Sequence, residues 1–208
     1  MPDLQVWIGV PQLAALLILF QRGLEELYSA ANTKRLLDRG AKESGRSFYP
    51  VVAVTHLGWI AGLFFIIPPD AVIYWPLIAV YLILQGVRYW VIASLGPYWT
   101  HRIITLPGDP LVRRGPYKYL RHPNYVITLI ETALLPIAFG AWAFAAIMTA
   151  IWAVVLHYKI GLEDAALDER RGVTPAPSKL MDSQDQVGSG PNTRTAFNPP
   201  KANEFDIE

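Results

Sequence analysis

The densest group of side chains that could take part in chemistry lies in residues 108–125, which read GDPLVRRGPYKYLRHPNY. The segment holds three tyrosines, a histidine and several basic residues directly before an apolar stretch. Pro116 and Pro123 disfavour a helical conformation for the residues before them, so we expect residues 117–121 to form a short helix between two turns. Such a loop offers tyrosine rings, cations and backbone groups to a small ligand at a membrane surface. A basic, aromatic interface belt would have a similar composition.

Four ionisable residues lie inside apolar stretches, namely His56, Arg88, Glu131 and His157. Ionisable groups are costly in a bilayer, so they usually face the interior of a helix bundle and mark functional sites. We expect Glu131 to be a catalytic residue that positions or deprotonates a substrate hydroxyl, or else to form a structural ion pair, for example with Arg88. Arg88 would anchor an anionic group in the bundle or extend to the lipid headgroups. The two histidines are weaker candidates, because a neutral imidazole can be satisfied by a backbone carbonyl.

The composition predicts a polytopic membrane protein. Charged residues make up 17% of the 208 residues, and they concentrate in 21–48, in 101–121 and after 158. Soluble domains carry about 25% charged residues. A net charge of +1 argues against nucleic-acid binding. The absence of cysteine excludes disulfides and thiolate metal sites, and we expect no metal centre.

Five apolar stretches approach the roughly 20 residues that a helix needs to cross a bilayer. They predict an all-α membrane domain over 1–171. We expect the first stretch to be a retained membrane helix, because a secretory signal has positive charge before a shorter apolar region. Breaks at residues 68–70, at Pro136 and at Gly140 predict two helical hairpins. The predicted spans are 4–20, 48–67, 71–93, 125–139 and 141–158.

Loop charges predict the orientation of these spans. The predicted loops 21–47 and 96–124 are rich in Lys and Arg, whereas the turns at 68–70 and at 140 have neither. Because basic short loops stay in the cytoplasm, we expect an outside N-terminus and a cytoplasmic C-terminus. Residues 172–208 are rich in Pro, Ser, Asn and charge, and they predict a disordered tail.

Three separated motifs resemble those of one family, the isoprenylcysteine carboxyl methyltransferase family of integral membrane methyltransferases. GPYKYLRHPNY at 115–125 resembles its signature GPYxxxRHPxY. KIGLEDAAL at 159–167 resembles its RxxxEExxL, and GVRYWVIASLGPYW at 86–99 resembles its G-x-x-R…LG-x-x-W/F helix end. The agreement covers about 84–168, the catalytic core of the family. Two positions depart from the pattern: Lys159 replaces an arginine, and Asp164 replaces the second glutamate. Lysine cannot make the two-pronged hydrogen bonds of arginine.

The resemblance implies S-adenosylmethionine as the methyl donor, bound between the RHPNY loop and the cytoplasmic end of the last helix. Glu163 would accept hydrogen bonds from the donor, and Arg121 would pair with its carboxylate. Tyr117 or Tyr125 would face the sulfonium by cation–π attraction. His122 is carried over from the family as a residue of this pocket.

A wider resemblance concerns the methyl acceptor. Residues 32–50 with His56, together with the pattern through Glu131 and Pro136, are similar to a bacterial subgroup of the family. Its members are often associated with type III polyketide synthases and methylate hydroxyl groups of long-chain alkylpyrones or alkylresorcinols. We therefore expect O-methylation of a lipid-like acceptor at the cytoplasmic face of a bacterial plasma membrane. A carboxylate acceptor needs no base, so a buried Glu131 favours a hydroxyl acceptor.

Three alternatives to this function are carboxyl methylation of an isoprenylcysteine-type substrate, an NADPH-dependent membrane reductase, and a non-enzymatic scaffold or transporter.

Overall fold

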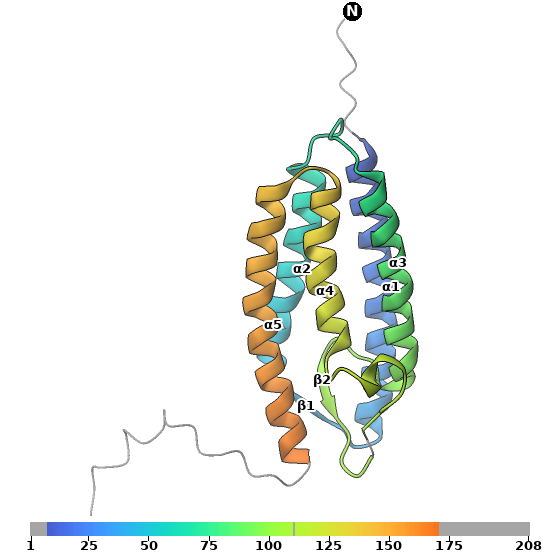
Figure 1. Cartoon of the computed structure of the whole chain (residues 1–208). Helices are drawn as coiled ribbons and strands as arrows, with labels where there is room; N and C mark the ends of the chain where they lie inside the picture. The colour runs from blue at the N-terminus through green and yellow to red at the C-terminus, as the bar shows by residue number, and fades with distance from the viewer. Residues whose placement is uncertain (1–7, 110, 171–208) are drawn as a thin grey trace, which may run out of the picture. The chain divides into compact units, whose positions relative to one another are not determined.

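Five helices and a two-stranded sheet make up the part of the chain that the computed structural model describes, residues 8–109 and 111–170 (Figure 1). The predicted all-α class and the five helices are confirmed. The tail expected at 172–208 lies outside the described residues. The helices are α1 (Val10–Asp38), α2 (Tyr49–Phe65), α3 (Trp75–Leu95), α4 (Pro123–Ala138) and α5 (Trp142–Arg170).

Two of the helices are longer than predicted. α1 continues from Phe20 through Asp38, and α5 continues past Tyr158 to Arg170. The prediction of a loop over 21–47 was therefore wrong for residues 21–38. The apolar composition ends near Phe20, but the helix continues because a polar face of α1 finds partners on the other helices.

Polar side chains along α1 satisfy backbone groups of neighbouring elements. The side-chain amide of Gln12 donates hydrogen bonds to two carbonyl oxygens at the C-terminal end of α2, at 3.1 and 2.8 Å. The amide of Asn32 does the same for two carbonyl oxygens of the turn after α3, at 3.1 and 2.9 Å. The hydroxyl of Ser29 accepts from the backbone N–H of His101 at 2.8 Å. Buried polar groups need such partners, so α1 fixes the positions of both turns.

A small antiparallel sheet joins the segments that follow α1 and α3. β1 (Lys42–Ser44) pairs with β2 (Ile103–Thr105), with Lys42 opposite Thr105 and Ser44 opposite Ile103. Three short 3-10 helices complete the connections: η1 (Arg46–Phe48), η2 (Gly96–Tyr98) and η3 (Gly115–Lys118). The sequence did not predict the sheet, because strands of three residues carry too little alternation to be recognised.

The helices have the surface of an integral membrane protein. Within the described residues, three segments are long and apolar enough to cross a membrane: Arg46–Phe65, Trp75–Tyr98 and Trp142–Asp168. α4 has 16 residues and is apolar, but at 1.5 Å per residue it is only about 24 Å long. Large apolar side chains such as Leu17, Phe65 and Ile83 are exposed, as expected where helices face lipid.

The turns between hairpin helices lie at one end of the bundle. The backbone N–H of Tyr74 before α3 donates to the carbonyl of Ala138 at the end of α4 at 2.8 Å, which links the two turns. In Figure 1 both turns lie at the top, whereas β1, β2 and the end of α5 lie at the bottom. Every predicted basic loop therefore belongs to the end opposite Asp70.

This arrangement predicts the outcome of a topology experiment. A reporter fused after Gly45 or after Gly172 is expected to report cytoplasm, and one inserted at Asp70 is expected to report the outside, because loops rich in Lys and Arg are retained in the cytoplasm. Paired cytoplasmic and periplasmic reporters measure this directly. A cytoplasmic signal at Asp70 would reverse the predicted orientation.

Candidate active site

A cavity of about 350 Å³ lies between the end of α3, the loop before α4 and the C-terminal part of α5. We call it the polar cavity because charged side chains line it, although aliphatic side chains such as Leu95, Leu106 and Leu167 also contribute to its wall. Its volume is in the range of small-molecule sites. Four of the five residues predicted to bind the methyl donor line this cavity, and Asp164 joins them. The four are Tyr117, Arg121, His122 and Glu163.

Glu163 holds the loop and α5 together. Its carboxylate oxygen Oε2 accepts a hydrogen bond from the Tyr125 hydroxyl at 2.5 Å and lies 3.4 Å from Nδ1 of His122. Nε2 of His122 lies 3.4 Å from the Asp164 carboxylate. The hydrogen bond to Glu163 raises the pKa of His122 above its usual value. The rings of His122 and Tyr125 stack with their centroids 5.3 Å apart.

The loop before α4 is docked on the end of α3. The short helix expected at 117–121 is the 3-10 helix η3 at Gly115–Lys118. Gly115 has a φ of +55°, and a Cβ at this position would clash with the side chain of Ser94. Nε of Arg114 donates to the Ser94 carbonyl oxygen at 2.5 Å. These contacts place Tyr117 and the residues after it on the rim of the polar cavity.

Tyr117 and Arg121 offer the polar cavity an aromatic ring and a cation. Burial raises the pKa of the Tyr117 phenol, so the phenol is neutral at pH 7. The side chain of Arg121 is 75% exposed, and its guanidinium lies 3.9 Å from the Asp164 carboxylate. The charge of Arg121 is therefore available to an anionic group of a ligand.

A second cavity of about 280 Å³ lies among α1, α2, α4 and α5. Most of its wall is apolar, and its polar groups come from all five helices and from the turn before β2. The apolar side chains are Leu19, Val52, Leu57, Trp152 and Leu156, and the polar ones include Glu26, His101, Tyr125 and Lys159.

Tyr125, the fifth residue predicted to bind the methyl donor, stands in the wall between the two cavities. It lines the apolar cavity, whereas its hydroxyl reaches Glu163 of the polar cavity. Nζ of Lys159 lies 5.1 Å from the centroid of the Tyr125 ring and donates to the His101 carbonyl oxygen at 2.9 Å. The two cavities thus adjoin through one aromatic ring.

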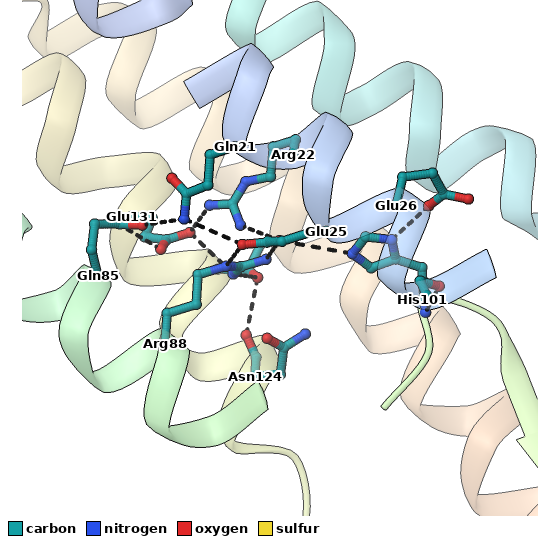
Figure 2. Close-up of polar contacts among 11 residues, drawn as sticks. Gln21, Arg22, Glu25, Glu26, Gln85, Arg88, His101, Asn124 and Glu131 are labelled. Carbon is teal, nitrogen blue, oxygen red and sulfur yellow. Dashed lines mark hydrogen bonds and ion pairs between the residues drawn. The ribbon is translucent and has the colours of Figure 1, made fainter. Parts of the chain in front are cut away.

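Four buried charged residues form an ion network among α1, α3 and α4 (Figure 2). Arg22 lies 2.6 Å from Glu25 and 2.8 Å from Glu131. Arg88 lies 2.7 Å from Glu25 and 3.3 Å from Glu131. The two positive and the two negative charges cancel, and this pairing offsets much of the desolvation cost of burying all four in the bundle interior.

The network bears on the alternatives predicted for Arg88 and Glu131. The ion pair between these two residues is present. Arg88 is 2% exposed, so its guanidinium is held inside the bundle and does not extend to headgroups. Glu131 is 1% exposed and lines neither of the two cavities. This position favours a structural role for Glu131, and its catalytic role stays a prediction.

The sequence did not single out Arg22, Glu25, Glu26 or His101, because they fall in segments expected to be loops. One signal was available. The buried residues of α1 recur at steps of three and four, through Ile18, Arg22, Glu25, Ser29 and Asn32, as on one face of a helix.

The two other histidines of the apolar stretches take different positions. His56 lines the apolar cavity and packs edge-on against Trp59 and Trp152. His157 is exposed on α5 and lines neither cavity. Among the described residues, no group of three or more His, Asp or Glu side chains is arranged to hold a metal ion.

Comparison with known proteins identifies the family. The family model of isoprenylcysteine carboxyl methyltransferases (ICMT) matches residues 77–169. The chain is 36% identical over 157 residues to the uncharacterized protein YpbQ of Bacillus subtilis (strain 168), a match that covers 74% of this chain and 94% of YpbQ. The chain belongs to the ICMT family. An uncharacterized protein of Haemophilus influenzae is 29% identical over 91 residues, which cover 43% of this chain and 53% of that protein. No solved structure matches the chain.

The ICMT match covers every residue that lines the polar cavity except Leu36, but only part of the apolar cavity. Residues 77–169 include most of α3, all of α4 and nearly all of α5. The residues that α1 and α2 contribute to the apolar cavity, such as Glu26 and Val52, lie outside the match. Of the two departures from the ICMT motif, Asp164 faces the polar cavity and Lys159 faces the apolar one.

Proposed function

We propose that this ICMT family member is an S-adenosylmethionine-dependent O-methyltransferase. Its acceptor is a hydroxyl group of a membrane-embedded, lipid-like molecule such as a long-chain alkylpyrone or alkylresorcinol. The observation that carries the proposal is the pair of adjoining cavities, one polar and one apolar, on either side of Tyr125. A methyltransferase with a water-soluble donor and a lipid acceptor needs two such compartments in contact.

The side chains of the polar cavity fit the chemical groups of S-adenosylmethionine. Glu163 and Asp164 can accept hydrogen bonds from its hydroxyl and ammonium groups, and the exposed guanidinium of Arg121 can pair with its carboxylate. The ring of Tyr117 is available for cation–π attraction to a sulfonium. When bound, S-adenosylmethionine supplies an electrophilic methyl group.

The apolar cavity fits the acceptor. Leu19, Leu57 and Trp152 can cover the hydrocarbon tail of the acceptor, whereas its oxygen would meet the polar groups around Tyr125 and Lys159. Alignment of the two reactants and exclusion of water can supply much of the acceleration of a methyl transfer. A type III polyketide synthase would supply such an acceptor, so we place this protein downstream of one, in a bacterial plasma membrane with the active site facing the cytoplasm.

The test of this function uses the purified full-length chain in lipid vesicles with radiolabelled S-adenosylmethionine. A long-chain alkylresorcinol is expected to take up the label and to gain the mass of one methylene group. Labelling of an isoprenylcysteine analogue in its place would support carboxyl methylation. Binding of NADPH without binding of S-adenosylmethionine would support the membrane reductase. If the protein binds neither cofactor and transfers no methyl group, an enzymatic role is contradicted.

A further inference from the structure

His101 lines the apolar cavity beside its other polar groups. Figure 2 shows its ring between the carboxylates of Glu25 and Glu26. Nδ1 lies 2.7 Å from Oε2 of Glu26, a hydrogen-bond distance. Nε2 lies 3.9 Å from Oε2 of Glu25, which is too long for a hydrogen bond. Within the described part of the chain, Nε2 of His101 has no hydrogen-bond partner.

The contact with Glu26 determines which nitrogen carries the proton. A carboxylate only accepts hydrogen bonds, so Nδ1 of His101 is the protonated nitrogen and Nε2 has a free lone pair. The backbone around the ring is held on both sides: the N–H of His101 donates to Ser29 at 2.8 Å, and its carbonyl accepts from Lys159 at 2.9 Å. The ring also packs edge-on against Trp99, with centroids 4.7 Å apart. The imidazole is therefore both oriented and rigidly held.

The other polar groups of the apolar cavity are poorer bases. Arg22 and Arg88 are permanently cationic. Nε2 of His56 is buried without a hydrogen-bond partner, so it does not face the cavity as an accessible lone pair. The Tyr125 hydroxyl already donates a hydrogen bond to Glu163.

The carboxylates of the ion network are equally unavailable to an acceptor. Oε2 of Glu25 accepts from both Arg22 and Arg88, and Glu131 lines neither cavity. The remaining carboxylate of the apolar cavity is that of Glu26, and it already accepts a hydrogen bond from Nδ1 of His101. His101 lines the same cavity as Tyr125, and Nζ of Lys159 lies near both the backbone carbonyl of His101 and the Tyr125 ring.

We propose that His101, oriented by Glu26, is the general base that takes the proton of the acceptor hydroxyl during methyl transfer. The inference rests on the proposed function, because only a hydroxyl acceptor has a proton to lose. The acceptor oxygen forms a bond to the methyl carbon of the sulfonium donor as the carbon–sulfur bond breaks and its electron pair stays on sulfur. The hydroxyl proton moves to Nε2, and Glu26 stabilises the resulting imidazolium until the proton leaves to water.

The surroundings of His101 favour its basic form at neutral pH. Burial lowers the pKa of His101, while the hydrogen bond to Glu26 opposes this shift. Turnover should therefore be constant near neutral pH and fall as the imidazole becomes protonated at lower pH. The charged and titratable groups around His101 are Arg22, Glu25 and Glu26 on α1, Tyr49 and His56 on α2, Arg88 on α3, Tyr125 on α4 and Lys159 on α5.

The first test needs no methyl donor. A long-chain alkyl nitrophenol changes colour on ionisation, so its absorbance reports proton loss when it binds to the protein in vesicles. Wild-type protein is expected to bind a larger ionised fraction than His101→Gln at the same pH, because glutamine cannot accept the proton. Equal ionised fractions in the two proteins would overturn the inference.

The second test is kinetic. His101→Gln is expected to lower turnover by about 10²- to 10⁴-fold, with the affinity for S-adenosylmethionine kept and the fall at low pH abolished. Glu26→Gln should also lower turnover, because its amide can donate to Nδ1 and leave the proton on Nε2. His157→Gln is the matched control and should behave as wild type, since His157 is exposed and lines neither cavity.

The outcomes separate this inference from the proposed function. If wild-type protein methylates the alkylresorcinol and His101→Gln does so at the same turnover, the base assignment is wrong and the function stands. If wild-type protein methylates no hydroxyl acceptor, the function fails, and the nitrophenol measurement still decides whether His101 removes a proton in this cavity. Unfolding temperatures of all variants show whether a lost activity reflects a lost fold.

Discussion

Replacing Glu131 by glutamine is expected to lower the free energy of unfolding by about 3–5 kcal/mol, because it leaves buried arginine charge without its partner. Oε2 of Glu131 accepts from Arg22 at 2.8 Å and from Arg88 at 3.3 Å, while Oε1 accepts from the Gln85 amide at 2.8 Å. A glutamine has one acceptor oxygen. Its NH₂ group would face either the two arginines or the amide donor of Gln85, and Gln85 cannot turn without losing its hydrogen bond from Gln21.

Thermal unfolding in detergent micelles, followed by circular dichroism, measures this effect. Glu43→Gln is the control, because it removes a partly exposed ion pair with Arg102 (3.0 Å) and should cost about 1 kcal/mol or less. The double variant Glu131→Gln with Arg22→Gln restores charge balance and is expected to recover part of the loss. An unfolding midpoint equal to that of wild type in Glu131→Gln alone would show that the network is not what stabilises the bundle.

The same preparation tests the catalytic role predicted for Glu131. Below its unfolding temperature, Glu131→Gln should keep its turnover, because Glu131 lines neither cavity. A loss of about 10²- to 10⁴-fold without a change in stability would support the role of base or positioning residue. In the proposed mechanism the base is His101, so the two glutamine variants should separate into a stability effect for Glu131→Gln and a turnover effect for His101→Gln.

The hairpins of the fold could be predicted because their breaks are local. Pro68 and Pro69 follow the end of α2, and Gly140, with a φ of +73°, separates α4 from α5, whereas Pro136 lies inside the last turns of α4, which continues to Ala138. The lengths of α1 and α5 could not be predicted in the same way. Both helices run beyond the apolar composition, since polar side chains such as Arg22 and Asn32 on α1 and Glu163 on α5 find partners on other elements. Hydropathy shows where lipid contacts a helix, not where the helix ends.

The polar cavity was predictable for a related reason. Tyr117, Arg121 and His122 are contiguous in one motif, and Glu163 belongs to another short motif, so neither needs a fold to be recognised. The apolar cavity combines single residues from segments far apart in the chain. Glu26 meets His101, and Arg22 meets Glu131, only after α1 packs against the rest of the bundle. No local pattern marks such pairs.

Replacing Glu163 by glutamine is expected to weaken S-adenosylmethionine binding by about 10- to 150-fold. Hydrogen bonds to a charged group contribute about 1.5–3 kcal/mol, and the substitution removes the charge with almost no change of shape. The substitution should also weaken the contacts that hold the binding-site side chains in place, because Glu163 contacts both the Tyr125 hydroxyl and the His122 imidazole. His122→Ala should therefore weaken binding in the same direction.

Equilibrium binding of radiolabelled S-adenosylmethionine to the purified proteins tests this prediction, with Glu43→Gln as a carboxylate control that lines neither cavity. Membrane insertion and the unfolding midpoint should stay near wild type in Glu163→Gln, since Glu163 is only half-buried at the cavity rim and takes no part in the ion network. Weakened binding with a retained fold would place the donor in the polar cavity. Unchanged affinity in both Glu163→Gln and His122→Ala would mean that the polar cavity is not the donor site, although its residues and the family motif fit one. The assignment of the adjoining apolar cavity to the acceptor would then fail as well.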